Sequence, residues 1–305
     1  MGLEAYGVSG MNEPIEGRRA FTLLEVLVVI GIIGVLIAIL IPSLSRAREQ
    51  SRSAVCQTNL HTLGQGWGMY ADENQDIMLP ARMPRHSDGG FANPANHYAI
   101  TTGLKYRPRW PALMQQHVGM PALPKPVTYR DRQNYEGSVY VCPSVSEWKD
   151  ERNAAYGYNY QFLGSHRVAG DRLRKISQQS RIRNTGKTVV IADCNGSAAA
   201  FPARERLPYE NAAREERRRG NYGWLLDPPR LEAGSSRAGG PGSRRSGPDP
   251  RHRDRVNVVF ADDHAALLSL QELGFGVKAG GQIVDSGEGA HNRVFSGTGE
   301  DSDPP

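Results

Sequence analysis

The chain has 305 residues, of which 39% are hydrophobic, and its mean hydropathy of −0.51 indicates that most of it is water-soluble. Its 34 glycines and 20 prolines are many for a compact domain and predict long loops. The net charge of +5 equals the surplus of 13 arginines over 8 acidic residues in residues 204–255 alone. The basicity is local, which argues against a fold built as a whole to bind nucleic acid.

Residues 21–42 are predicted to form a transmembrane helix. The apolar run at residues 21–41 is 21 residues long, or about 31 Å as a helix, close to the roughly 30 Å of a bilayer's hydrocarbon core. Arg18 and Arg19 stand directly before it and favour a cytoplasmic N-terminus, although Arg46 and Arg48 follow the run. A single-pass orientation with the bulk of the chain outside the cytoplasm is therefore expected.

Glu25 is the one ionisable residue inside this apolar run. A carboxylate at the centre of a membrane helix costs about 2.5–3.5 kcal/mol, and a simple anchor has no use for one. We therefore expect Glu25 to have a cationic partner at the same depth.

The segment RRAFTLLEV, with its apolar run ending at Pro42, resembles the N-terminal cleavage and methylation motif of type IV pilins and type II secretion pseudopilins. The resemblance implies that residues 1–20 are a leader cut by a prepilin peptidase between Ala20 and Phe21, and that Phe21 is then N-methylated. Ala20 departs from the family's usual glycine, but it is small, so cleavage is expected. The true start is either Met1 or Met11.

The resemblance also implies a place and partners for the protein. These are the inner membrane with a periplasmic head, membrane lipid, an inner-membrane assembly platform, other pilin or pseudopilin subunits and, after assembly, a filament. The new α-amine of Phe21 would lie one helical turn from Glu25 and could come from the neighbouring subunit, which would set the register of assembly. A cleaved secretory signal peptide and a plain signal anchor are the alternatives. Both leave Glu25 unexplained.

Residues 43–76 are predicted to continue as an amphipathic helix whose apolar stripe packs on a sheet. Pro42 should kink the helix at the membrane exit because it lacks an N–H group. Gly64, Gly66 and Gly68 should weaken the helix, which is expected to fray before Asp72.

Residues 77–290 are predicted to form the globular head. Strands are expected at residues 138–142, 188–194, 256–261 and 265–270, the last two as a hairpin around Asp262, Asp263 and His264. A long helix followed by strands predicts an α+β fold with an antiparallel sheet and long loops. Residues 205–255 are expected to hold a mobile insertion, and residues 291–305 a disordered tail.

The segment HRDRVNVVFADDH resembles the C-terminal H-x9-DG signature of some pseudopilin-like proteins. Nine residues separate His252 from Asp262, as the signature requires, but Asp263 stands in place of its glycine. If the turn needs a positive φ there, aspartate tolerates it better than most residues.

Three cysteines are present, without a CxxC pair that would indicate a zinc site. A periplasmic head favours one disulfide, and Cys142 with Cys194 is the preferred pair because both end predicted strands. Cys56 lies on a helix and could pair with either, and three buried thiols are the alternative to any disulfide.

Four residues, His252, Asp262, Asp263 and His264, are of types that can ligate a metal. A strand of about eight residues, or roughly 25 Å, separates His252 from the others, so only Asp262 and Asp263 remain as calcium candidates. A hydrogen-bonded turn is the favoured interpretation of these two residues, and we expect no cofactor. No GxSxG, P-loop or HExxH motif is present, so no enzyme is expected. Two functions remain: a filament subunit, or a membrane-anchored binding protein that captures DNA or acidic polysaccharide through its basic loop.

Overall fold

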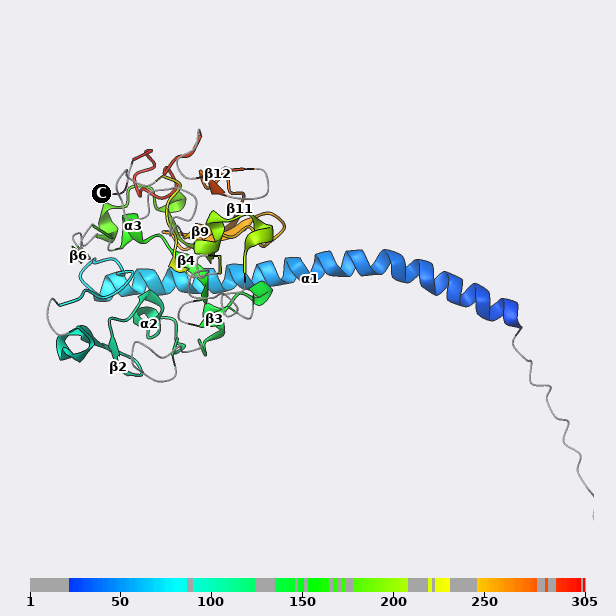
Figure 1. The fold of residues 1–305 in the computed structure, drawn as a ribbon, viewed down its shortest axis with the longest axis horizontal. Helices are drawn as coiled ribbons and strands as arrows, with labels where there is room; N and C mark the ends of the chain where they lie inside the picture. Colours follow the sequence, from blue (N-terminus) through cyan, green and yellow to red (C-terminus); the bar gives the residue numbers. More distant parts are fainter. Residues whose placement is uncertain are drawn as a thin grey trace, which may run out of the picture. The chain divides into compact units, whose positions relative to one another are not determined.

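The fold is described from a computed structural model of the chain (Figure 1). The structure describes residues 22–86, 90–123, 135–145, 148–150, 153–164, 167–168, 172–173, 178–207, 219–220, 223–230, 246–278, 283–284, 289–302 and 304. By its internal contacts the chain divides into two units, Met1–Ala47 and Arg48–Pro305. We call residues 22–47 of the first unit the anchor segment and the second unit the head.

Helix α1, Leu23–Glu73, is continuous through both units. Pro42 lies inside it without ending it, and the hydroxyl of Ser43 donates a hydrogen bond to the carbonyl of Leu40 at 2.8 Å. The helix ends at Glu73, inside the predicted segment 43–76 and just past the point before Asp72 where fraying was expected. Gln75 and Asp76, which have positive φ, then turn the chain away. Within the head, α1 buries one face at helical spacing, and its buried residues there are Ser53, Cys56, Leu60, Leu63, Gly64, Gly66, Trp67 and Ala71.

The main sheet of the head has the strand order β11-β10-β7-β4-β3, with β8 beside β4 and β9 beside β7. All its pairs are antiparallel except β4 with β8, so the predicted α+β class is confirmed. Its strands are β3 (Lys149–Asp150), β4 (Asn153–Tyr158), β7 (Val189–Gly196), β8 (Gly223–Leu225), β9 (Gly247–Pro248), β10 (Val256–Phe260) and β11 (Ala265–Leu268).

Short elements surround this sheet. Three further strand pairs are β1 (His97–Ile100) with β2 (Gly103–Tyr106), β5 (Arg167–Val168) with β6 (Arg172–Leu173), and β12 (Gly276–Val277) with β13 (Ile283–Val284). The short helices are α2 (Trp110–Met114), α3 (Tyr160–Leu163) and the 3-10 turns η1 (Gly90–Ala92), η2 (Pro94–Asn96), η3 (Ser138–Tyr140), η4 (Pro143–Val145), η5 (Gln179–Arg181), η6 (Thr185–Lys187), η7 (Ser197–Ala200) and η8 (Ala203–Glu205).

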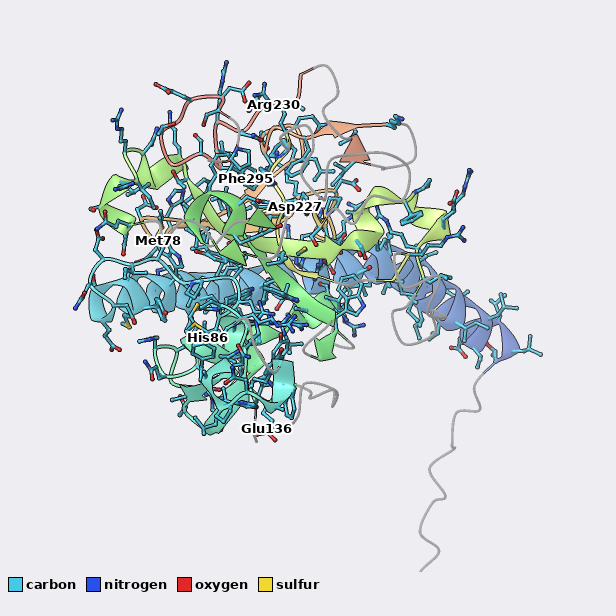
Figure 2. The ribbon with its side chains drawn as sticks, turned by 60° about the vertical axis from the view of Figure 1, so that its left-hand side comes forward. Met78, His86, Glu136, Asp227, Arg230 and Phe295 are labelled. Atoms are coloured by element: carbon cyan, nitrogen blue, oxygen red, sulfur yellow. A yellow bond between two sulfur atoms is a disulfide. The ribbon has the colours of Figure 1, made fainter. Side chains whose placement is uncertain are left out.

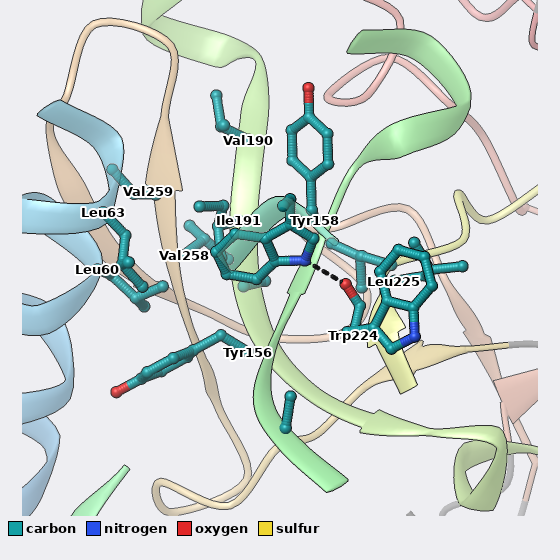
Figure 3. Packing of buried hydrophobic residues seen from close by; sticks show 14 of the residues in the cluster. Leu60, Leu63, Tyr156, Tyr158, Val190, Ile191, Trp224, Leu225, Val258 and Val259 are labelled. Atoms are coloured by element: carbon teal, nitrogen blue, oxygen red, sulfur yellow. Dashed lines mark hydrogen bonds between the residues drawn. The ribbon is translucent and has the colours of Figure 1, made fainter. Parts of the chain in front are cut away.

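The core of the head forms where α1 meets the sheet. Figure 3 shows Leu60 and Leu63 of α1 beside Val258 and Val259 of β10. The helix comes very close to the strand at Gly64, where an added Cβ would lie 2.6 Å from Cγ2 of Val259. The sequence suggested that Gly64 weakens the helix, but in the structure its lack of a side chain is what allows the helix to pack closely on the strand.

Of the four predicted strands, three are confirmed and one is wrong. Strand β7 and the β10–β11 hairpin occupy the predicted segments, and Val256 pairs with Leu268 in the hairpin. Residues 138–142 do not form a strand: Ser138–Tyr140 is the 3-10 helix η3, which places Cys142 on a loop.

The C-terminal residues are packed into the head, so the prediction of a disordered tail is wrong for the described part. Phe295 is fully buried (Figure 2), and its carbonyl accepts a hydrogen bond from the side-chain amide of Asn159 at 3.0 Å. The amide of Val189 donates to the carbonyl of Val294 at 2.8 Å, so the tail satisfies backbone groups at the start of β7.

Candidate functional sites: the N-terminal segment and a buried cysteine–histidine cluster

The anchor segment is apolar and exposed along its length. Every described side chain from residue 22 to residue 48 is exposed, including Leu23 at 82%. Among the described residues, α1 is the helix long and apolar enough to cross a membrane. Exposed apolar surface on this scale is unstable in water, so it requires lipid or another protein to cover it.

The start of α1 is held by Thr22 and Glu25. The backbone N–H and the hydroxyl of Thr22 each donate to the Glu25 carboxylate at 2.9 Å, and the N–H of Glu25 points to the Thr22 hydroxyl at 3.2 Å. This reciprocal pattern is a capping box, which satisfies N–H groups that a helix leaves unpaired at its start. The T-x-x-E spacing could have indicated it from the sequence, but the sequence reasoning considered only an ionic partner for Glu25.

Four predicted residues of this region, Arg18, Arg19, Ala20 and Phe21, lie outside the described residues. The pairing of the Phe21 α-amine with Glu25 therefore stays a prediction.

The disulfide joins Cys56 to Cys142, with Cα atoms 5.5 Å apart, so the preferred pairing of Cys142 with Cys194 is wrong. The pairing links α1 to the loop between η3 and η4. Cys194 is a free, buried thiol on β7 whose sulfur lies 3.2 Å from the carbonyl oxygens of both Leu225 and Gly247, so either can accept its single S–H. Burial raises the pKa of the Cys194 thiol to about 12, so it is an inert packing group.

The disulfide is part of a buried cluster that the sequence reasoning missed. Sulfur atoms of Cys56 and Cys142, a carboxylate oxygen of Asp193 and a ring nitrogen of His252 all lie within 4.8 Å of one another, and all four residues are buried. They come from α1, the loop after η3, β7 and the turn before β10. A sequence signal did exist, because Asp193 is an acid inside the apolar strand TVVIADC.

His252 is oriented by a tight turn and a carboxylate. Its backbone N–H and carbonyl both bond to Arg255, and Arg253 and Asp254 between them have positive φ, as in a type I′ turn. In the side chain, Nδ1 lies 2.8 Å from Oε1 of Glu49, and Nε2 faces the cluster. There Nε2 lies 3.5 Å from the Cys142 sulfur and 3.5 Å from Oδ2 of Asp193.

Asp193 is a fully buried carboxylate with only part of its hydrogen-bonding capacity used. Its Oδ2 accepts the backbone N–H of Asn257 at 2.8 Å. Within the described part of the chain, its Oδ1 has no hydrogen-bond partner. Burial raises the pKa of Asp193 to about 6, and the nearby charges of Arg251 and His252 oppose the rise. The carboxylate stands beside the disulfide with one oxygen free to bind a further group.

Comparison with known families found a match at the N-terminus of the chain. Residues 17–41 match the family model described as the prokaryotic N-terminal methylation motif. The chain carries a prepilin-type methylation motif. The motif is consistent with the type IV pilin-like family and supports processing by a prepilin peptidase. Comparisons with curated proteins and with solved structures found no match.

The match to the methylation motif ends at residue 41, within the anchor segment, and includes nothing of the head. Together with the apolar helix, it indicates a membrane-anchored, single-pass protein. The resemblance of residues 252–264 to the H-x9-DG signature is not part of this match and stays a prediction.

The turn after β10 has a positive φ at Asp263, where the H-x9-DG signature has a glycine. Asp263 has φ +69°, in the left-handed region that glycine adopts at least cost. Oδ1 of Asp262, one of the two calcium candidates, is 2.6 Å from Nδ1 of His264 and accepts its backbone N–H at 3.3 Å. These contacts make the hydrogen-bonded turn that the sequence offered as the alternative.

Much of the predicted basic insertion, including residues 208–218 and 231–245, lies outside the described residues. The last part of this insertion is packed into the head, so the prediction that the mobile segment extends to residue 255 is wrong. Gly247–Pro248 form β9 against β7, and Arg251 is buried with its Nε 2.9 Å from Oδ2 of Asp249. At least one of the arginines that raise the net charge is therefore structural.

Proposed function

We propose that this chain is a structural subunit of a pilus-like filament, either a type II secretion pseudopilus or a type IV pilus-like filament, and has no catalytic role. The methylation motif at residues 17–41 is the observation that carries the proposal. The motif joins a processing site to an exposed apolar helix with a carboxylate near its start. A helix that leaves the bilayer to pack against identical helices in a filament needs these features.

The anchor segment suits both environments. Its apolar side chains match lipid before assembly and the helices of neighbouring subunits afterwards. Gly34 and Ala38 are four residues apart, a spacing of small residues that lets apolar helices approach closely, and an added Cβ at Gly34 would meet nothing within 4 Å. Close helix contacts are thus available without rearrangement of this segment.

Glu25 supplies the polar contact that lipid cannot. In the single chain its carboxylate caps its own helix through Thr22. After cleavage, the α-amine of Phe21 in a neighbouring subunit would offer it a full positive charge. An ion pair removed from water is stronger than a hydrogen bond to a neutral group, so the exchange would favour assembly at one register.

Arg18 and Arg19 give the expected orientation, with the leader in the cytoplasm and the head in the periplasm. A periplasmic head is consistent with the disulfide between Cys56 and Cys142, because disulfides persist in oxidising compartments.

The test of processing is the mass of the N-terminal peptide of the protein extracted from membranes. We expect a peptide that begins at Phe21 and is heavier by one methyl group. The Ala20→Leu variant should keep its leader, because the larger side chain blocks the peptidase. An uncut leader in the unmodified chain would reduce the protein to a signal-anchored one, and a start near Arg46 would make it a secreted domain.

The test of assembly compares two substitutions of Glu25. Glu25→Gln keeps an acceptor for Thr22 but removes the charge, whereas Glu25→Val removes both. If the charge sets the register, both variants should insert, be cleaved and then fail to enter filaments. Normal filament entry of Glu25→Gln, with failure of Glu25→Val, would show that capping of the helix matters and the ion pair does not.

A further inference from the structure

We propose that the buried cluster of Cys56, Cys142, His252 and Asp193 is a zinc site when its disulfide is reduced. In the oxidised head the two cysteines form a covalent link. In the reduced head the same two sulfurs, with one imidazole nitrogen and one carboxylate oxygen, would hold a single zinc ion.

The ligand set and its burial fit a structural zinc site. Zinc prefers four tetrahedral ligands drawn from cysteine, histidine and acidic side chains. Bond lengths of about 2.3 Å to sulfur and about 2.0 Å to nitrogen or oxygen put tetrahedral ligand atoms roughly 3.3–3.8 Å apart. The four atoms of the cluster lie within 4.8 Å of one another, so they need to move by only about an ångström. Two thiolates exclude calcium and magnesium, which take oxygen ligands.

The surroundings hold the ligands in place. Nδ1 of His252 lies 2.8 Å from Glu49, which leaves Nε2 directed at the cluster, and a carboxylate behind a histidine is the usual support of a zinc ligand. The Glu49 carboxylate is itself held by the hydroxyl of Ser144 at 3.1 Å. Such support is unnecessary for a disulfide, which needs no histidine.

Asp193 gives an independent indication. A carboxylate with 0% exposure is costly to bury, and its Oδ1 has no hydrogen-bond partner among the described residues. Nothing in the disulfide requires an acid at this place. A bound cation would use the free oxygen and offset the cost of burial.

The exchange between the two states balances. A dithiol reductant supplies two electrons and two protons, the S–S bond breaks to give two thiols, and the dithiol becomes a disulfide. Zinc then binds both sulfurs as thiolates, and their two protons pass to solvent. Since all four ligands are buried, the ion would enter while the head folds, and its role would be structural.

The experiment uses the full chain in detergent micelles. The head is opened with denaturant, reduced with a phosphine, which takes up oxygen from water as it is oxidised, and returned to buffer with one equivalent of Co²⁺ as a spectroscopic substitute for Zn²⁺. We expect the thiolate-to-metal charge-transfer and visible bands of tetrahedral cobalt, one ion per chain, and loss of both bands when Zn²⁺ is added. The chain treated in the same way without the phosphine should show none of them.

Four variants assign the site. Cys56→Ala and His252→Ala should lose the cobalt bands, and Glu49→Gln should weaken binding by about 10- to 100-fold, because it alters only the support of the histidine. Cys194→Ser is the matched control, since it removes a buried thiol outside the cluster and should leave the bands unchanged.

Three results would overturn the proposal. The first is a reduced head that regains its far-ultraviolet circular dichroism but shows no thiolate–cobalt bands. The second is a reduced chain that fails to refold even with the metal, because a structural ion should replace the cross-link. Bands that persist in Cys56→Ala but vanish in Cys194→Ser would also place the metal elsewhere.

Discussion

The cross-link between Cys56 and Cys142 should contribute a large part of the stability of the head. The perturbation that tests this is the double substitution Cys56→Ala with Cys142→Ala, which removes the link without burying a hydroxyl group. The two residues are 86 apart in sequence, so the link closes a long loop in the unfolded chain.

The expected magnitude follows from that loop. In the chain-entropy model a loop of 86 residues loses about 15 cal/mol/K, which at 298 K is about 4.6 kcal/mol of stability. Domains are commonly stable by about 5–15 kcal/mol, so the double variant should retain only part of its margin. With a guanidinium slope of about 4 kcal/mol/M, the midpoint should fall by about 1 M.

Tryptophan fluorescence in guanidinium measures this in detergent, because Trp67, Trp110, Trp148 and Trp224 all belong to the head and the anchor segment has none. A chelator is included so that no metal replaces the link. Cys194→Ala is the matched control, because it removes a buried thiol without breaking the link, and it should shift the midpoint much less. An unchanged midpoint and slope in the double variant would refute the loop-entropy reasoning.

Three further predictions concern the head. Gly68→Ala should stabilise the head by about 0.8–1 kcal/mol through helix propensity. Gly64→Ala should instead destabilise it by about 1–3 kcal/mol, because the new Cβ would lie 2.6 Å from Val259. Equal thermal shifts in the two variants would contradict the packing argument. Asp263→Val should cost about 1–2 kcal/mol relative to Asp263→Gly in denaturation, because φ is +69°, and equal stability would mean that the turn relaxes. Alkylation should label no thiol in the native chain, because Cys194 is buried and the other two cysteines are in the disulfide. It should label Cys194 alone after unfolding without reductant, and all three cysteines after unfolding with reductant. Labelling of the native chain would contradict the burial of Cys194.

The sequence was most informative where one period or one residue type dominates a segment. The apolar run predicted the helix that begins at Leu23. The sequence pattern also predicted that the second half of this helix packs on the sheet, but not which face does so. Ala54, Val55 and Thr58, which follow the expected spacing, are exposed, whereas the buried face carries Cys56, Leu60 and Trp67. Alternating and apolar runs located β7, β10 and β11. Each of these segments buries a face or matches a membrane, so its pattern reflects one physical demand.

The buried cluster could not be predicted in this way, because its members are brought together by tertiary packing. Cys56 and His252 are nearly 200 residues apart in sequence, and no local period connects a helix face to a turn before a strand. The disulfide was assigned to strand ends because SVYVC alternates, whereas that segment forms the 3-10 helix η3. Composition predicted a disordered tail, although Phe295 and Asn292 are both fully buried in the head.

The continuity of α1 has a mechanical consequence. A force applied to the anchor segment travels along the helix into the head and meets a covalent bond at Cys56. The helix cannot slide out of the head while that bond is intact. If the head is stretched from its two ends, the 86-residue loop between the cysteines stays closed, so about 300 Å of chain cannot be extended while the disulfide is intact. Pulled from its N-terminus, the head therefore behaves as a shorter and stiffer body than its chain length implies.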